Sequence, residues 1–304
     1  MENLTASQKV SKRLIAELLK EEIRLFALKG KGLVNNAYYV ETRTGKYIVK
    51  QEREDKEFQP QNNLVVEAAV IKQLATLNLS TPVPNVVFVC EEPKMYGYKY
   101  IEGDMLINVW TAMTEEEKIS ICRELGNFHA EIGKKFTKQM AEEVGIKINT
   151  SLDVHQETIK DNESILSDKE VPEELKNLLK ETRQIFDTTM HKGLFQFLHN
   201  DAQHENILIR DKKISGIIDF GESEYGEVVK EFSRYIRDFP NYFQYIVSAY
   251  EEKSGNKLLY KRLVSYSLLS GFIDIVESYL KGGEEKIKAE NFISIYKKLM
   301  SSKV

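Results

Sequence analysis

The stretch FLHNDAQHENILIRDKKISGIIDFG, residues 197–221, carries more information than any other part of the chain. Two apolar runs, at 207–209 and 214–218, flank a polar segment that favours a turn. Short apolar runs separated by turn residues predict a β-hairpin. Asn206 precedes the first run and Asp219 follows the second, so the hairpin is expected to bring both side chains to one end.

Asp201 lies in the loop before this hairpin, and Asp219 opens an Asp-Phe-Gly triplet. Carboxylate and amide oxygens are the ligands that Mg²⁺ prefers, and phosphoryl transfer needs a further carboxylate to orient the attacking hydroxyl. We therefore predict Asp201 as the catalytic base, and Asn206 and Asp219 as metal ligands. The alternative is a surface hairpin with unrelated acidic residues, but the ordered set His-x-Asp, Asn and Asp-Phe-Gly is far more specific than the triplet alone.

The composition is that of an ordinary globular protein. The 304 residues carry a net charge of −4, with 42% hydrophobic and 30% charged residues. This balance offers no general basic field for nucleic acid or anionic membrane. The first residues lack the apolar centre of a signal peptide, and no apolar run approaches the roughly 18 residues of a membrane span. We expect a cytoplasmic protein, without nucleic-acid or membrane partners and with an oligomeric state that the sequence does not define.

The first hundred residues predict a small antiparallel sheet crossed by one helix. Short β-like runs occupy 23–50, a helical pattern covers 64–77, and two further strands are expected near 86–90 and 96–101. After Gly103 the chain changes to long amphipathic helices. They are expected near 114–133, 153–167, 172–190, 227–236, 240–253, 257–281 and 284–301, after a first helix at 7–22. These patterns predict an α+β fold, with a sheet-based N-lobe at 1–101 and a larger, mostly helical C-lobe at 102–304.

Candidate nucleotide-binding residues lie in the predicted N-lobe. Gly30, Gly32 and Asn35 have the spacing of a kinase glycine-rich loop, with Asn35 in place of the third glycine because Asn tolerates left-handed torsions. Lys50 ends the following strand, where a kinase lysine holds phosphates. Glu67 stands in an apolar helical run, and a buried carboxylate needs a partner, so we predict a Lys50–Glu67 pair.

The strand at 96–101 leads into the junction between the predicted lobes. In a kinase the backbone of this hinge binds the edge of the base, so Lys99 and Ile101 are candidates through their main-chain groups. The sequence does not separate ATP from GTP as the nucleotide.

Two features argue against a protein kinase. Asn200 stands where regulated protein kinases use Arg between His and Asp, and no Ala-Pro-Glu motif follows Asp219. The chain resembles the aminoglycoside phosphotransferase family and its relatives choline kinase and homoserine kinase. The resemblance runs from the glycine-rich segment through Lys50, Glu67 and the 197–221 stretch. It implies a bilobal, protein-kinase-like fold and O-phosphorylation of a small hydroxylated molecule by a nucleoside triphosphate with Mg²⁺.

One departure from the family lies downstream. Many members have Gly-Asp-Pro followed by a further Asp, whereas this chain has Gly226, Glu227, Val228 and then Glu231. The family resemblance also implies an acidic pocket if the acceptor is a cationic antibiotic of the aminoglycoside type, as in antibiotic resistance. Candidates for such a pocket are Glu222, Glu224, Asp238, Asp274 and Glu277. Two rival hypotheses remain: a metabolic kinase of choline, homoserine or a sugar derivative, and a catalytically inactive kinase-like binding protein.

Overall fold

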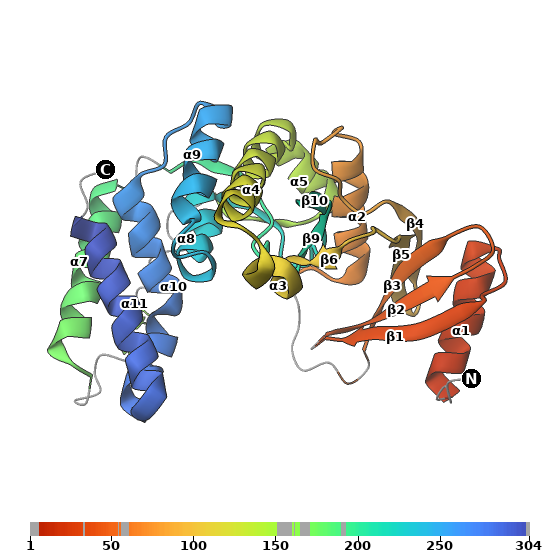
Figure 1. The fold of residues 1–304 in the computed structure, drawn as a ribbon, viewed down its shortest axis with the longest axis horizontal. Helices are drawn as coiled ribbons and strands as arrows, with labels where there is room; N and C mark the ends of the chain where they lie inside the picture. The colour runs from red at the N-terminus through yellow and green to blue at the C-terminus, as the bar shows by residue number, and fades with distance from the viewer. Residues whose placement is uncertain are drawn as a thin grey trace.

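The computed structural model describes residues 6–32, 34–53, 55, 61–150, 160, 162–164, 171–189 and 193–301. The helix predicted at 153–167 lies largely outside these residues. Figure 1 shows the N-terminal sheet at one end of the molecule and the last helices at the other, with α4 and α5 between them.

The N-terminal part is an antiparallel five-stranded sheet in the order β1-β2-β3-β5-β4. Helix α1 (Ala6–Leu19) contributes Ile15 to a small core on one face of this sheet, together with Phe26, Tyr38 and Val49. The predicted antiparallel sheet is therefore present. Its strands are β1 (Leu25–Lys31), β2 (Asn35–Glu41), β3 (Lys46–Glu52), β4 (Val86–Glu91) and β5 (Lys94–Lys99).

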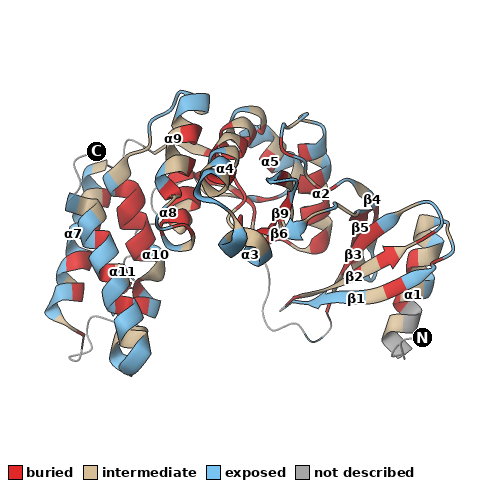
Figure 2. Ribbon diagram, viewed as in Figure 1, coloured by how far each residue is buried: buried red, intermediate tan, exposed pale blue. Residues whose placement is uncertain are grey.

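Helix α2 (Leu64–Ala75) connects this sheet to the rest of the protein. Asn63 caps it by accepting hydrogen bonds from the backbone N–H groups of Val65 (2.9 Å) and Val66 (3.1 Å). Its buried side chains join Ile48 of the sheet to a core that continues into the helical region. Figure 2 shows the buried stripe along α2. The helix that carries Glu67 is thus fixed to both parts of the molecule.

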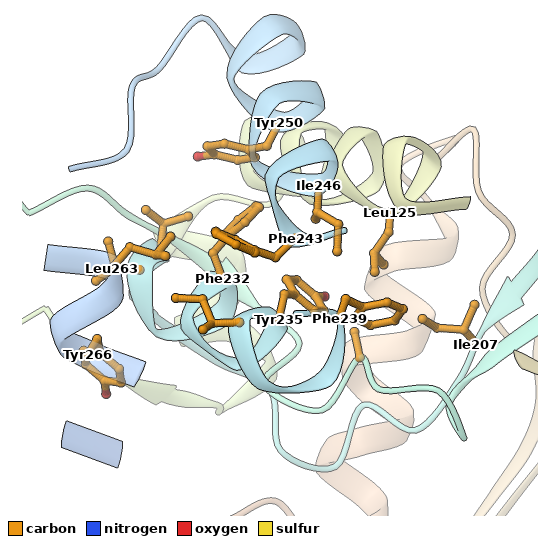
Figure 3. Packing of buried hydrophobic residues seen from close by; sticks show 14 of the residues in the cluster. Leu125, Ile207, Phe232, Tyr235, Phe239, Phe243, Ile246, Tyr250, Leu263 and Tyr266 are labelled. Carbon is orange, nitrogen blue, oxygen red and sulfur yellow. The ribbon is translucent and has the colours of Figure 1, made fainter. Parts of the chain in front are cut away.

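The C-terminal part is mainly helical and encloses the larger core. Helices α4 and α9 pack closely, and Figure 3 shows Leu125 of α4 facing Ile246 of α9 above the aromatic side chains of α8. The predicted helices are present within one to three residues of their expected ends wherever the structure describes them. They are α4 (Glu115–Lys135), α7 (Glu173–Thr189), α8 (Val228–Asp238), α9 (Phe243–Ser254), α10 (Tyr260–Lys281) and α11 (Gly283–Ser301), to which the structure adds α3 (Leu106–Val109) and α5 (Lys138–Val144).

The predicted hairpin is confirmed as β9 (Ile207–Arg210) and β10 (Lys213–Ile217), with β6 (Asp104–Met105) beside β9. Asp211 and Lys212 make the turn with positive φ angles of 51° and 63°, as a tight two-residue hairpin requires. A further sheet of β7 (Lys147–Ile148), β11 (Glu224–Glu227) and β8 (Phe195–Leu198) was not predicted. Its strands have at most four residues, too few to show a periodic pattern.

Helix α10 is long and apolar enough to cross a membrane by length and composition, and more than half of its apolar window is buried inside the protein. A core helix of a soluble protein passes the same test, and the burial of Leu263, Leu268 and Phe272 fits that interpretation.

Candidate active site

The loop between β8 and β9 is a tight structure held by its own hydrogen bonds. The side-chain amide of Asn206 donates to both the Oδ2 atom and the main-chain oxygen of Asp201, each at 2.8 Å. The N–H of Ile218 donates to the carbonyl of Asn206 at 2.9 Å, which joins this loop to the segment that carries Asp219. Asp201 is therefore positioned by the residue predicted to bind metal, and the amide oxygen of Asn206 remains available.

His199 has a structural position. Its Nδ1 accepts the backbone N–H of Asp201 at 3.1 Å, and its Nε2 lies 3.0 Å from the carbonyl oxygen of Ile218. Burial lowers the pKa of His199 to about 4, so the ring is neutral near pH 7 and Nε2 carries the proton that it donates. The imidazole thus connects the loop to the strand that leads to Asp219.

Glu231 of α8 holds the same loop from the other side. Its Oε2 accepts the backbone N–H groups of His199 (2.6 Å) and Asn200 (3.0 Å), and the side chain is 1% exposed. Asn200 has a φ of 62°, a left-handed torsion that Asn tolerates well. The longer acid that replaces the usual Asp therefore reaches the loop and satisfies two donors that the turn leaves without partners.

Lys50, Glu67 and Asp219 form one network, in which Lys50 and Glu67 are buried and Asp219 is partly exposed. The Nζ of Lys50 lies 2.9 and 3.1 Å from the carboxylate oxygens of Glu67 and 2.9 Å from Oδ1 of Asp219. Glu67 also accepts the backbone N–H of Phe220 at 3.1 Å. The predicted Lys50–Glu67 contact is present, and it extends across the molecule to the Asp-Phe-Gly segment.

The charges of this network support one another. Burial alone would lower the pKa of Lys50, but the carboxylates of Asp219 and Glu67 outweigh burial and raise it. Burial alone would raise the pKa of Asp219, but the neighbouring ammonium of Lys50 lowers it, so Asp219 is ionised. Burial raises the pKa of Glu67 despite the attraction of Lys50. Removal of Lys50 would leave two carboxylates without a cation between them.

Asp201 is a carboxylate with an elevated pKa. Burial raises the pKa to about 6, against the opposing effect of Arg234, whose Nη2 lies 3.1 Å from Oδ1. Its two carboxylate oxygens thus have separate partners, Arg234 at Oδ1 and Asn206 at Oδ2. A pKa near the operating pH is what a general base requires.

The donor set beside Lys50 fits Mg²⁺ as a hard cation. Among the described residues no group of three or more His, Cys, Asp or Glu side chains forms an all-protein metal site. Asp219 is ionised with its side chain 44% exposed, and Asn206 retains its amide oxygen. Mg²⁺ is held in phosphotransferases by one or two protein oxygens together with phosphate oxygens, and these two side chains can supply the protein oxygens.

The glycine-rich segment forms the turn between β1 and β2. Within the described part of the chain, a Cβ added at Gly30 would meet no heavy atom within 4 Å, so this residue leaves room for a close approach. The carbonyl of Gly32 accepts a hydrogen bond from Arg53 at 2.5 Å, and its N–H donates to the carbonyl of Asn35 at 2.9 Å. Asn35 is a strand residue and has no positive φ, so the expected left-handed role of Asn35 is wrong. The closed turn achieves its shape without that torsion.

The two hinge candidates differ in their main-chain contacts. The N–H of Lys99 already donates to the carbonyl of Asn85 at 3.1 Å. The N–H and carbonyl of Ile101 have no hydrogen-bond partner within the part of the chain that the structure describes. The Ile101 side chain lies against Gly216 of β10, where a Cβ would approach it to 3.0 Å. Ile101 is therefore the better placed of the two to bind a ligand through its backbone.

A cavity of about 600 Å³ opens beside the catalytic loop, between α8, α10 and α11. Asn200 and Arg234 line it and also contact the Asp201 region, so the cavity and the loop share a wall. A second cavity of about 780 Å³ lies near Tyr100, Gly103 and the tip of the β9–β10 hairpin. The first cavity is the one adjacent to the candidate base.

The structure disperses the five acidic residues predicted for an acceptor pocket. Asp274 lines the cavity, whereas Glu277 is exposed and is absent from its lining. Glu224 is fully buried and pairs with Lys230 at 2.6 Å. Asp238 lies beside Arg234 and Arg237, and Glu222 is half-buried near Asp219. These residues form no single acidic surface.

Sequence analysis missed Arg234, which contacts the carbonyl of Asn200 as well as Asp201 and Asp238. A signal was available: Arg234 is three residues after Glu231 and four before Asp238, hence on one face of α8. The other replaced acid, Glu227, makes a buried two-point contact with Arg262 of α10, at 2.5 and 2.9 Å. That partner lies too far along the chain for spacing to reveal it.

An antiparallel N-terminal sheet, a helical C-terminal part and this lysine–carboxylate network define a kinase-like small-molecule phosphotransferase. The profile of the phosphotransferase enzyme family matches residues 29–255. The chain belongs to that family. No curated protein matches it significantly.

Solved structures agree with the fold. The GDP complex of aminoglycoside 2'-phosphotransferase-IIIa is 14% identical with a TM-score of 0.67, covering 97% of this chain and 99% of that chain. The macrolide 2'-phosphotransferase MphH from Brachybacterium faecium is 15% identical with a TM-score of 0.67, covering 94% and 98%. The gentamicin complex of APH(2")-IIa is 18% identical with a TM-score of 0.61, covering 100% and 98%. At these identities the likeness establishes the kinase-like fold.

Proposed function

We propose that this phosphotransferase moves the γ-phosphate of a Mg²⁺-bound nucleoside triphosphate to a hydroxyl group of a small molecule. The observation that supports this most strongly is the convergence of Asp201, Asn206, Asp219 and Lys50. Asn206 donates a hydrogen bond to Asp201 at 2.8 Å, and Lys50 of strand β3 donates one to Asp219 at 2.9 Å. The hydrogen bond from the N–H of Ile218 to the carbonyl of Asn206, at 2.9 Å, connects the two pairs. A structural network alone has no need for a half-exposed ionised Asp219 beside a carboxylate with an elevated pKa.

The nucleotide is proposed to lie between a lobe at 1–101 and a lobe at 102–304. Lys50 would contact the phosphates, with Glu67 holding its ammonium in place, and Gly30 and Gly32 would let the backbone approach them. Ile101 is the preferred hinge contact, and Lys99 stays a candidate through its carbonyl only. ATP and GTP both remain possible nucleotides.

Asn206 and Asp219 would hold Mg²⁺, which supplies charge neutralisation for the phosphates when it is bound. Asp201 would accept the proton of the acceptor hydroxyl as the hydroxyl oxygen attacks the γ-phosphorus, while the bond from this phosphorus to the bridging oxygen breaks and the nucleoside diphosphate leaves. The chain contributes chiefly by positioning: Asn206 fixes one oxygen of Asp201, and Glu231 and His199 fix the backbone on either side of it.

The acceptor is proposed to enter the cavity between α8, α10 and α11, because this cavity adjoins Asp201. An aminoglycoside-type antibiotic is the first acceptor to test, since similar folds include complexes with gentamicin and kanamycin, and a macrolide is the second. Choline, homoserine and sugar derivatives belong in the same panel as metabolic alternatives.

The test is a transfer assay with each nucleotide, with and without Mg²⁺, against this panel. We expect Mg²⁺-dependent transfer to at least one hydroxylated acceptor, and Asp219→Asn should weaken Mg²⁺-dependent nucleotide binding. Calorimetry that detects no binding of Mg-ATP or Mg-GTP would instead favour a kinase-like binding protein without catalysis.

A further inference from the structure

The cavity beside Asp201 is lined by basic side chains on its catalytic side. Lys230, Arg234 and Arg237 recur at helical spacing on α8, so they lie on one face, and Lys288 of α11 also lines the cavity. Arg234 stands at the junction with the reaction centre, 3.1 Å from Asp201. An acceptor that offers its hydroxyl to Asp201 must therefore lie next to a guanidinium group.

The carboxylates that pair with the three basic residues of α8 lie outside the lining. Lys230 pairs with Glu224, which is fully buried, and Arg234 and Arg237 share Asp238, which does not line the cavity. Arg237 contacts Asp238 through Nε at 3.2 Å and is 53% exposed, so its remaining N–H groups are open to a ligand. A molecule in the cavity therefore contacts the cationic groups of α8 rather than the carboxylates that pair with them.

Among the residues that the structure describes, three acidic side chains line the cavity, and two of them already have partners. Glu231 accepts the backbone N–H groups of the catalytic loop, and Glu285 pairs with Lys288. Asp274 is the lining carboxylate without a hydrogen-bond or ion-pair partner in the described ranges. One free carboxylate suits at most one amine, whereas a polycation needs several.

Binding of the acceptor would increase the excess of unpaired positive charge in the cavity. An acceptor hydroxyl that bonds to Oδ1 of Asp201 competes with Arg234, which then loses one partner in a partly buried position. An ammonium group there would meet like charge, whereas an anionic oxygen on the acceptor would restore the lost contact.

We propose that the acceptor carries a carboxylate or phosphate group close to its reacting hydroxyl, and that Arg234 and Arg237 bind this group. The inference rests on the proposed phosphoryl transfer and narrows its acceptor away from polycationic aminoglycosides. Arg237 is the better residue to test, because it does not contact Asp201 in the described structure.

The experiment compares small acceptors that differ in charge: glycerate, glycerol phosphate, neutral glycerol, ethanolamine and the polycation kanamycin. For each, calorimetry with Mg-ADP present measures binding and a transfer assay measures kcat/KM. We expect glycerate or glycerol phosphate to exceed the amines by about tenfold or more. The carboxylate and phosphate arms identify which anionic group the site prefers.

The variant Arg237→Glu should raise the KM of the preferred acid by about tenfold or more, with kcat and nucleotide binding nearly unchanged. Arg123→Glu is the control, since Arg123 is also a surface arginine on a helix and lies on α4 away from this cavity. Far-ultraviolet circular dichroism checks the fold of both variants.

Preference for kanamycin or ethanolamine over both acids would overturn the proposal. So would an unchanged KM in Arg237→Glu, or failure of both acids to bind at millimolar concentration while Mg-nucleotide binds. If the wild-type protein bound no Mg-nucleotide at all, the result would count against the proposed function instead.

Discussion

The reaction centre and the proposed acceptor cavity share a wall at Asn200 and Arg234, but they are built in different ways. The reaction centre uses loop residues that are fixed by short hydrogen bonds to backbone groups, such as Glu231 to His199 and Asn206 to Asp201. The cavity uses the faces of α8, α10 and α11, whose side chains reach it from the helix surface. The difference suggests that the chemistry is constrained tightly while the acceptor can vary through surface substitutions.

The largest effect is expected from Asp201→Asn. The amide keeps the size of the side chain but cannot accept the proton, so kcat should fall by about 10²–10⁴. Nucleotide binding should survive, because Lys50 and Asp219 are untouched. Steady-state kinetics and calorimetry measure the two quantities. Activity within a few-fold of the wild type would mean that Asp201 is not the base.

A large loss of stability is expected from Lys50→Met. It leaves Glu67, which is 1% exposed, without its cation. Breaking a buried ion pair on one side costs about 3–5 kcal/mol. The double variant Lys50→Met/Glu67→Gln should recover part of this loss because it removes the buried charge, and urea denaturation gives the free energy of unfolding. Equal stability of the single and double variants would contradict the network described for this centre.

The pH dependence of kcat/KM should show an acid limb that reports Asp201. Its pKa is raised by burial to about 6, so activity should fall as pH drops through that value and the base becomes protonated. His199 is an unsuitable source of this limb, since burial lowers its pKa to about 4. Arg234→Met should move the limb to higher pH, because the guanidinium lowers the pKa of Asp201.

The raised pKa of Asp201 also makes the stability of the folded state depend on pH. The folded-state pKa of Asp201 lies above its ordinary value of 3.8, so this carboxyl stabilises the folded state less as pH rises from about 4 to 6. Asp201→Asn should abolish that contribution. In the kcat/KM profile, an acid limb that stays at the same pH in Arg234→Met would mean that Asp201 is not the group that titrates there.

The smallest effect is expected from a pair of helix glycines. Gly271 lines the cavity in α10, and among the described residues a Cβ there would meet only Ile275 at 4.0 Å, so Gly271→Ala should stabilise the folded state by about 0.5–1 kcal/mol. Gly126 in α4 lies against the backbone of α9, so Gly126→Ala should destabilise by at least that amount. Thermal denaturation compares them, and equal shifts would contradict the different packing of the two positions.

Much of the reaction centre could be predicted from the sequence because its residues belong to local motifs. Asp201, Asn206 and Asp219 lie within one hairpin segment, and the charge of Glu67 in an apolar helix demanded a partner such as Lys50. The lining of the proposed acceptor cavity could not be predicted. Glu224 lies in the short strand β11 and is buried, and whether Asp274 meets a ligand depends on which face of α10 packs inward. Spacing along the chain gives no such information for distant segments.

The sequence alone determined the N-terminal sheet, the long helices that the structure describes, the hairpin and the residue types gathered at its end. Their spacing is local and their charges require partners. Only the tertiary structure decided that Glu227 pairs with Arg262, that Glu231 accepts hydrogen bonds from the loop backbone, and that basic side chains of α8 line the cavity. These contacts join segments about thirty residues or more apart, and the packing of the shared core, rather than spacing along the chain, sets which of them meet.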